Sequence, residues 1–390
     1  MSRLEELIQQ LCSDGVEYRT LVSVSNILYG YPLDAKLFTE DDSFMPVIRI
    51  RDIKSGCTST YYKGEIPNNY IVQKGDILVG MDGEFNLECW KSADAYLNQR
   101  ILKLSSKDDN IILNRYLYHL MKPIFKKIEQ SIMGSTVKHL SDKIIKRITI
   151  PLPPVEVQEE IVRILDNFTE LTAELTAELT ARKKQYEYYR DELLTFGDDV
   201  TRMILGDIGE VSMCKRILKS DTNTEGGIPF FKIGTFGKIP DAYITREKFE
   251  EYKSKYSYPN KGDILISASG TIGRTVIYNG EPAYYQDSNI VWLAHDESIV
   301  LNKYLYYFYQ LNPWTIATGG TIARLYNDNI RKTVIPVPQL SEQKRIVDIL
   351  DRFDQLCNDI TEGLPAEIEA RKKQYEYYRD RLLTFKEKTA

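Results

Sequence analysis

The sequence lacks the features that mark secreted, zinc-binding and membrane-spanning proteins. Its five cysteines are scattered, with no C-x-x-C pair and no histidine at ligand spacing, which argues against a disulfide framework and a zinc site. No segment reaches the length of about 18 apolar residues that a membrane span needs, and the amino terminus is amphipathic and charged rather than signal-like. We therefore expect a soluble, cytoplasmic protein with no membrane partner.

The sequence also lacks the motifs that would identify an enzyme. It contains no P-loop, no G-x-G-x-x-G word, no G-x-S-x-G word and only three histidines. The word NPW at residues 312–314 lacks the second proline of an amino-methyltransferase loop. Asp241, Glu251 and Lys253 could be combined into a metal-dependent nuclease site, but a solvated, charged helix explains them better. We expect a non-catalytic chain with no metal site or cofactor of its own.

An internal duplication decides the architecture. Residues 182–191 and 371–380 both read RKKQYEYYRD, and chance identity over ten positions is negligible. Weaker matches keep a similar offset, including KGDILVGMDG with KGDILISASG, LNRYLYHL with LNKYLYYF, and IPLPP with IPVPQ. The stretches after each Pro-x-Pro word are nearly constant, whereas the longer blocks before them share only short words. The chain of 390 residues is two copies of one module, in which one part was free to diverge.

The two constant stretches are predicted to be long helices. Apolar residues recur through both at spacings of three and four, as in a coiled coil, and proline words precede both. Gly363 and Pro365 should kink or restart the second helix. Each helix needs a mate for its apolar seam, so we expect the two to pack together, antiparallel if a pseudo-two-fold axis relates the modules. An amphipathic helix at residues 3–11 should bring the amino terminus to the last rod.

The diverged blocks alternate short apolar runs with Gly, Asn, Asp and Pro turns, and each ends in a helix. They are predicted to be mixed domains with short strands, so the fold class is α+β: two mixed α/β domains separated by two long antiparallel coiled-coil helices, in a pseudo-two-fold internal repeat. The expected organisation is a first domain with its N-terminal helix over 1–150, a constant helix over 151–197, a second domain over 198–335 and a second constant helix over 336–390.

The formal net charge of −5 at first argues against a partner as anionic as DNA. Residues 156–196 hold ten acidic and five basic side chains, and residues 341–385 hold ten acidic and eight basic ones. The two predicted rods therefore carry −7 together, which leaves +2 for the rest of the chain. The acidity belongs to the rods, and the diverged domains remain compatible with DNA.

Polar and basic clusters in both diverged domains are candidates for DNA contact. Arg, Lys, Gln and Ser side chains reach phosphates and base edges, and small-residue loops let the backbone approach a phosphate closely. The candidates in the first domain are Arg49, Arg51, Lys54, Tyr62, Lys63, Gln99, Arg100 and Lys138. Those in the second domain are Lys232, Ser269, Thr271, Arg274, Tyr285, Gln286, Gly320, Thr321 and Arg324.

The duplicated helical segment predicts a second kind of surface. Most of its tyrosines lie on the apolar seam and are expected to pack, but some residues off the seam are also unchanged between the copies. Solvated surface has no reason to stay identical, so this face predicts two copies of one partner. The candidate contacts are Lys183, Lys184, Tyr188, Lys372, Lys373 and Tyr377.

Two diverged domains that carry the KGDIL word and a G-T-I-like word, each followed by I-P-x-P and a near-identical helix, resemble the specificity subunit of Type I restriction-modification systems. The resemblance covers nearly the whole chain. It implies that each domain is a target recognition domain that reads one half of a bipartite, asymmetric site in double-stranded DNA. It also implies that the helices set the spacer and dock two DNA methyltransferase subunits, and that restriction subunits join them. S-adenosylmethionine, ATP and magnesium are then expected on those partners.

One departure from the pattern concerns the first domain. The Gly-Thr-Ile-Gly word of the second domain is replaced there by Gly83, Glu84, Phe85 and Asn86, so a contact loop does not transfer to that position. Two other readings stay open, a coiled-coil scaffold that binds only proteins and a nuclease that uses the Asp241 cluster.

The first helix contains a four-residue unit that is repeated at once: Thr172, Ala173, Glu174 and Leu175, then Thr176, Ala177, Glu178 and Leu179. Four helical residues add about 6 Å and about 40° of turn. One base pair adds roughly 3.4 Å and about 35°. The twist predicts that one unit corresponds to about one base pair of spacer.

Overall fold

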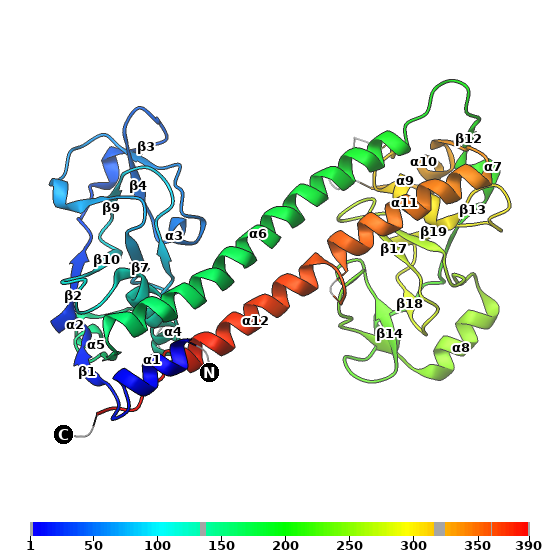
Figure 1. Cartoon of the computed structure of the whole chain (residues 1–390). Helices are drawn as coiled ribbons and strands as arrows, with labels where there is room; N and C mark the ends of the chain where they lie inside the picture. Colours follow the sequence, from blue (N-terminus) through cyan, green and yellow to red (C-terminus); the bar gives the residue numbers. More distant parts are fainter. Residues whose placement is uncertain (1–2, 133–137, 316–323, 360, 389–390) are drawn as a thin grey trace. The chain divides into compact units, whose positions relative to one another are not determined.

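The computed structural model of the chain describes residues 3–132, 138–315, 324–359 and 361–388 (Figure 1). The chain divides into two compact units, which we describe separately. Unit 1 comprises Met1–Thr176 and Ile368–Ala390, and unit 2 comprises Ala177–Glu367. The long helices α6 (Val155–Leu193) and α12 (Leu364–Leu382) each contribute to both units. No helix of the described ranges is long and apolar enough to cross a membrane.

Unit 1 contains two sheets and a strand pair. The first sheet is antiparallel, in the order β2 (Ser25–Tyr29), β10 (Ile101–Ser106), β7 (Ile77–Gly80), β8 (Leu87–Cys89). The second has the order β3 (Phe38–Thr39), β5 (Tyr61–Tyr62), β4 (Met45–Ile48), β9 (Ala95–Leu97), β6 (Ile71–Val72). Strand β1 (Glu17–Thr20) pairs with β11 (Thr149–Leu152). The helices of this unit are α1 (Arg3–Leu11), α2 (Leu21–Val24), α3 (Asp52–Ser55), α4 (Asn114–Ser131), α5 (Asp142–Ile145), η1 (Ala35–Leu37) and η2 (Asn68–Tyr70).

Unit 2 repeats this plan. Its four-stranded sheet has the order β13 (Glu210–Met213), β19 (Ile290–Ala294), β16 (Ile264–Ser267), β17 (Thr275–Ile277), and its smaller sheet β15 (Tyr243–Ile244), β14 (Ile228–Phe231), β18 (Tyr284–Tyr285). Strand β12 (Arg202–Ile204) pairs with β20 (Val334–Pro336) as β1 pairs with β11. The helices are α7 (Leu205–Ile208), α8 (Arg246–Lys255), α9 (Asn302–Tyr309), α10 (Asn327–Arg331), α11 (Leu340–Asn358) and η3 (Lys219–Asp221).

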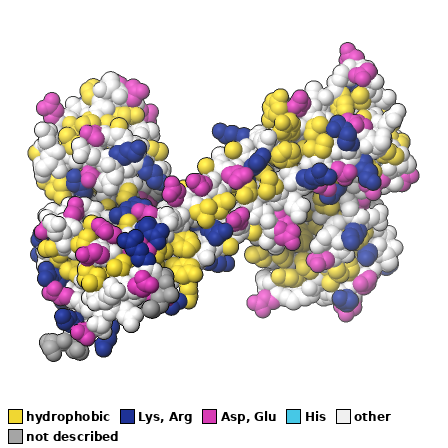
Figure 2. All heavy atoms as spheres, viewed as in Figure 1, with side chains coloured by type: hydrophobic (Ala, Val, Ile, Leu, Met, Phe, Trp, Pro, Cys, Tyr) yellow, Lys and Arg dark blue, Asp and Glu magenta, His cyan; other side chains and the backbone are white. Residues whose placement is uncertain are grey.

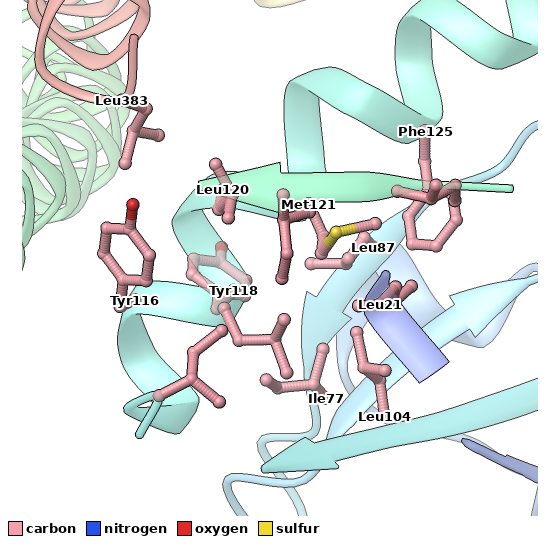
Figure 3. Close-up of a cluster of buried hydrophobic side chains, with 14 of the residues drawn as sticks. Leu21, Ile77, Leu87, Leu104, Tyr116, Tyr118, Leu120, Met121, Phe125 and Leu383 are labelled. Carbon is pink, nitrogen blue, oxygen red and sulfur yellow. The ribbon is translucent and has the colours of Figure 1, made fainter. Parts of the chain in front are cut away.

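The core of unit 1 lies between its four-stranded sheet and α4. Figure 3 shows Leu21, Ile77, Leu87 and Leu104 converging from α2 and three strands, with Phe125 of α4 beside them. All five side chains are almost fully buried. Burial of this kind stabilises a domain at roughly 25 cal/mol per Å² of apolar surface. The predicted closing helix and strands thus form one packed domain.

Within each unit, two constant segments pack against each other. In unit 1, Phe168 of α6 stacks on Tyr378 of α12 with ring centroids 5.4 Å apart, and Ile164, one turn earlier on α6, lines the same cavity as Leu382, one turn later on α12. Contacts that run in opposite senses along the two helices define an antiparallel pair. In unit 2, Tyr189 of α6 stacks on Phe353 of α11 at 5.7 Å, and Lys183, earlier on α6, interacts electrostatically with Cys357, later on α11. The predicted antiparallel packing of the rods is confirmed inside each unit.

The predicted interruption of the second rod is also confirmed. Helix α11 ends at Asn358 and α12 begins at Leu364. A Cβ atom on Gly363 would lie only 2.5 Å from the carbonyl oxygen of Gln355, so this turn requires glycine. Pro365 occupies the first turn of α12, where its missing N–H costs no helical hydrogen bond.

The two ends of the chain meet in unit 1. The N–H of Val16 donates to the carbonyl of Lys386, and the N–H of Lys388 donates back to Val16, each at 2.9 Å. The hydroxyl of Tyr18 donates to the carbonyl of Phe385 at 2.9 Å. This backbone pairing confirms that the amino terminus meets the end of the last rod.

Candidate nucleic-acid interface

Each unit contains one parallel strand pair among its described strands, and candidate residues follow its strands. In unit 1, β4 and β9 run parallel, with Ile48 opposite Leu97, so Arg49 and the segment 98–100 leave the sheet side by side. In unit 2, β14 and β18 run parallel, with Phe231 opposite Tyr285, and Lys232 and Gln286 follow them. The carboxyl edge of adjacent parallel strands is a common place for a ligand site.

The chain turns in the same way after β4 and after β14. The N–H of Arg49 donates to the carboxylate of Asp52 at 2.9 Å, and the N–H of Lys232 donates to the hydroxyl of Thr235 at 3.2 Å. These side-chain acceptors end the strands. Strand β4 therefore ends at Ile48, and residues 52–55 form α3. The side chains of Asp52 and Thr235, each three residues further along the chain, accept the backbone N–H hydrogen bond that a neighbouring strand would otherwise accept.

A polar cluster forms in unit 1 around the carboxylate of Asp82. Arg100 Nη1 donates to one carboxylate oxygen at 2.7 Å, and His139 Nδ1 lies 2.6 Å from the other. Burial favours the neutral acid, but the hydrogen bonds from His139 and Arg100 outweigh it and lower the pKa of Asp82. The side chain of Arg100 is 61% exposed, so its guanidinium is held by Asp82 and still faces solvent.

The backbone around this cluster is duplicated in unit 2. In unit 1 the N–H of Met81 donates to Arg100, and the N–H of Leu140 donates to Met81. In unit 2 the N–H of Ala268 donates to Asn289, and the N–H of Leu325 donates to Ala268. The positions after Met81 and Ala268, and those before Leu140 and Leu325, therefore correspond.

At the corresponding positions, unit 2 carries different side chains. Ser269 stands in the place of Asp82 and donates its hydroxyl hydrogen bond to Asn289 Oδ1 at 2.9 Å. Arg324 stands in the place of His139 and donates to the carbonyl of Ser288 at 2.9 Å. We name the two sets the polar hubs: Asp82, Arg100 and His139 in unit 1, and Ser269, Asn289 and Arg324 in unit 2. The same backbone arrangement thus carries a guanidinium and an imidazole around a carboxylate in unit 1 and a hydroxyl, an amide and a guanidinium in unit 2.

Most of the remaining candidates of unit 1 lie on its surface. Lys54 forms an ion pair with Glu84, Arg51 approaches Asp52 at 3.7 Å, and Lys63 lies over the ring of Phe44. Gln99 is exposed. Lys138 pairs with Glu129 at 3.6 Å and adjoins the hub.

Unit 1 also contains a cavity of about 370 Å³. Its lining includes Lys54, Lys122 and Lys126 together with Glu84 and Glu129. Figure 2 shows Lys and Arg side chains interspersed with Asp and Glu side chains on the surface of the molecule. The basic side chains could meet a phosphate backbone, and the acidic ones limit how tightly.

Several candidates of unit 2 make hydrogen bonds within the domain. Arg274 donates to the carbonyl of Phe236 at 3.0 Å, and Gln286 Oε1 accepts from the N–H of Ile233 at 2.9 Å. The carbonyl of Thr271 accepts a hydrogen bond from the hydroxyl of Ser267. Gly320 and Thr321 lie outside the described residues.

The structure corrects the interpretation of two tyrosines. Tyr62 is 6% exposed and accepts a hydrogen bond from the N–H of Asp34, and Tyr285 is 5% exposed and packs against Phe231. Both rings belong to the hydrophobic cores of their units. Each lies in a two-residue strand, which is too short for alternation in the sequence to indicate its inward face. Their role is packing rather than DNA contact.

A second cavity, of about 500 Å³, gathers residues that the sequence did not single out. Arg216, Lys219, Thr222 and Asn223 line it together with Lys232, which pairs with Asp241 at 2.9 Å. No periodicity or repeat marks the loop that supplies most of these residues. The other residues that line this cavity lie further along the chain, so no local sequence pattern indicates that the loop contributes to it.

The acidic residues weighed as a nuclease site bind separate lysines. Asp241 pairs with Lys232, and Glu251 pairs with Lys255 one turn along α8. Within the described ranges, no group of three or more His, Cys, Asp or Glu side chains could hold a metal ion.

The duplicated helical face has the same geometry in both units. Tyr188 is 64% exposed and Tyr377 is 61% exposed. Each tyrosine packs edge-on against its neighbour, Tyr189 or Tyr378, at 5.4 Å. The four paired lysines are exposed as well: Lys183, Lys184, Lys372 and Lys373.

The four-residue repeat lies in the middle of α6. Leu175 and Leu179 are partly buried, whereas the alanines and glutamates of both copies of the four-residue repeat are exposed. The boundary between the two compact units falls at Thr176, inside the repeat. The hydroxyls of Thr172 and Thr176 donate to the carbonyls one turn earlier, so the repeat is regular helix.

Comparisons with known proteins agree in one family. The family of Type I restriction modification DNA specificity domains matches twice, at residues 13–182 and 197–370. A Haemophilus influenzae protein assigned as a type I restriction enzyme specificity subunit is 47% identical, over 98% of each chain. The EcoR124I/EcoR124II specificity subunit of Escherichia coli is 33% identical, over 99% of this chain and 97% of its own.

Solved structures show a similar fold. An S subunit of a Type-I restriction-modification system from M. genitalium superposes with a TM-score of 0.53 at 16% identity, covering 95% of this chain and 96% of its own. A chain from a study of complex assembly and conformational transition of the type I R-M system gives 0.56 at 18%, covering 95% and 97%.

Proposed function

The chain belongs to the family of DNA specificity subunits of Type I restriction-modification systems, and from that premise we propose that each of its recognition domains reads one half of a bipartite, asymmetric DNA site. The observation that carries this proposal is the pair of polar hubs. The same backbone frame holds Asp82 and Arg100 in unit 1 but Ser269 and Asn289 in unit 2. Two domains built alike but lined differently suit two different half-sites.

The chain supplies recognition and no chemistry of its own. Methyl transfer from S-adenosylmethionine and cleavage driven by ATP, with magnesium, belong to separate methyltransferase and restriction subunits in the cytoplasm. Two methyltransferase subunits dock on the duplicated faces around Tyr188 and Tyr377. Support comes from the equal exposure and equal ring geometry of these faces, which offer one surface twice.

A guanidinium held by a carboxylate and open to solvent is suited to guanine, which accepts two hydrogen bonds from arginine in the major groove. Replacing Arg100 with alanine should relax one position of one half-site, at a cost of about 1–3 kcal/mol in discrimination, and leave the other half-site unchanged. The matched control is Arg19→Ala, since Arg19 is also exposed and ion-paired, with Glu17. The measurement is mapping of methylated bases in cells that carry the complete system.

The outcomes separate the competing functions. If both half-sites relax together, or neither changes, the assignment of one half-site to each domain is wrong. A scaffold that binds only proteins would show no salt-dependent preference for one bipartite duplex in the presence of methyltransferase subunits. A nuclease would lose activity when Asp241 and Glu251 are replaced in the purified chain.

A further inference from the structure

In unit 1, the amide of Gln158 joins the constant helix to the recognition domain. Its Nε2 donates to the carbonyls of Ile111 at 2.9 Å and Pro153 at 2.8 Å, and its Oε1 accepts from the N–H of Leu113 at 2.9 Å. The side chain is fully buried. Leu113 is the N-cap of α4, so Gln158 satisfies an N–H that no helical carbonyl can reach.

Unit 2 repeats this connection atom for atom. Gln343 Nε2 donates to the carbonyls of Ile299 at 2.9 Å and Pro338 at 2.8 Å, and its Oε1 accepts from the N–H of Leu301 at 2.9 Å. Gln343 is also fully buried, and Leu301 is the N-cap of α9. Between domains whose loops have diverged, identical buried hydrogen bonds indicate a shared mechanical requirement.

A tyrosine in the first turn of each domain helix adds a second connection. The hydroxyl of Tyr116 donates to the carbonyl of Pro151 at 3.4 Å, and that of Tyr304 donates to Pro336 at 3.1 Å. Both acceptors lie in the strands that lead into the constant helices, β11 and β20. The domain helix is thus bonded to the segment that precedes each rod.

A carboxylate two turns further along the rod makes the third connection. In unit 1, Asp166 Oδ1 accepts from Arg115 Nε and lies against His119 Nε2, each at 2.7 Å. In unit 2, Asp351 accepts from Lys303 Nζ and from the Tyr307 hydroxyl, each at 2.6 Å. The acceptor is the same in both units, while the donors differ.

The spacing of these contacts determines what they can do. Gln158 and Asp166 are eight residues apart, as are Gln343 and Asp351, which is about 12 Å along a helix. One contact would let the domain helix pivot, whereas two separated contacts fix its angle. The apolar side chains between them, such as Ile161 and Leu165, are buried but attract without direction. The hydrogen bonds add a directional constraint to this packing.

We propose that these side chains are positioning residues that hold each recognition domain at one angle on its rod and so restrict the bound DNA to one spacer length. We name them the joint residues: Gln158, Tyr116 and Asp166 in unit 1, and Gln343, Tyr304 and Asp351 in unit 2. This inference rests on the proposed function, because a spacer exists only if both domains read DNA.

The test uses the full chain with its methyltransferase partner and duplexes that carry both half-sites. The spacer is the preferred length, one base pair shorter or one base pair longer. Asp351→Asn should lower the preference for the right spacer over its neighbours by about tenfold and leave the half-site sequences unchanged. Tyr304→Phe, a milder change, should act in the same direction. The control is Asp348→Asn, an exposed carboxylate on the same helix.

Three results would overturn the inference. Affinity could fall by one factor at every spacer length, which would make the joint residues merely structural. The preference could stay as in the unmodified chain in both variants. If the unmodified chain has no preference for any bipartite duplex, the proposed function itself fails and the inference with it. Tyr304→Phe removes one hydroxyl only, so it keeps the test valid even if Asp351→Asn does not fold.

Discussion

The joints of the two units share a carboxylate acceptor at the same place on the rod but differ in the donors that meet it. In unit 1, Arg115 and His119 bind the carboxylate of Asp166, and in unit 2, Lys303 and Tyr307 bind the carboxylate of Asp351. Different donors serve one acceptor because a carboxylate can accept several hydrogen bonds in its plane. The difference teaches that the geometry of the joint was retained while its chemistry was free to change.

The buried glutamines should give the largest effect and the strictest test of equivalence. Gln158→Leu and Gln343→Leu each leave an N-cap N–H and carbonyl groups without partners, at an expected cost of about 3 kcal/mol or more. The loss of stability should be confined to the unit that carries the substitution. Hydrogen exchange at the amides of Leu113 and Leu301 measures it locally.

The exposed Gln355 of α11 provides the control, as Gln355→Leu should leave both amides protected. Equal losses in the two units would sharpen the comparison. Loss of protection in only one unit would contradict it, because Gln158 and Gln343 make the same hydrogen bonds.

The rods offer the next test, since α6 is continuous where α11 and α12 are separated by the turn at Gly363. Deleting residues 172–175 removes one four-residue unit, or about 6 Å and about 40° of helix. We expect both half-sites to be kept and the preferred spacer to shorten by about one base pair. Base-resolution mapping of methylated sites measures both. An unchanged spacer, or altered half-sites, would refute the role of the repeat as a ruler.

The smallest effect concerns pH, because only the joint of unit 1 contains a histidine. Burial, with help from the charges of Arg115 and Lys122, lowers the pKa of His119, although the hydrogen bond with Asp166 opposes this. In the unfolded chain, His119 takes up a proton near pH 6.5, whereas in the folded chain it binds that proton only at lower pH. The stability of unit 1 should therefore fall as the pH drops below about 6.5, by at most about 1.4 kcal/mol per pH unit.

Tyr307 stands in the place of His119 in unit 2, and burial and Asp351 raise its pKa, so it stays neutral in this range. His119→Tyr should remove the dependence from unit 1. Hydrogen exchange between pH 5 and pH 7.5, scored on α4 and α9, measures the difference. A decline of equal slope in both helices, or one that persists in the variant, would contradict the assignment to His119.

Some of the site could be read from the sequence because the repeat aligned it. The shared KGDIL word leads directly to Asp82 and Ser269, which follow matched strands. Gln158 and Gln343 also stand at matched positions, three residues before a buried isoleucine, and their identity in both copies indicates a shared role without showing what they contact. Tyr62 and Tyr285 were misinterpreted, since two-residue strands show no alternation from which an inward face could be assigned.

The sequence by itself determined the duplication, the constant rods, the break at Gly363 and the meeting of the chain ends, because each depends on periodicity, glycine and proline chemistry or direct comparison of two segments. Only the tertiary structure decided which side chains form the hubs and the joints. Asp82 meets His139 across 57 positions, and Gln158 meets Ile111 across 47. Contacts between residues so far apart depend on how sheets and helices pack, and no local pattern encodes them.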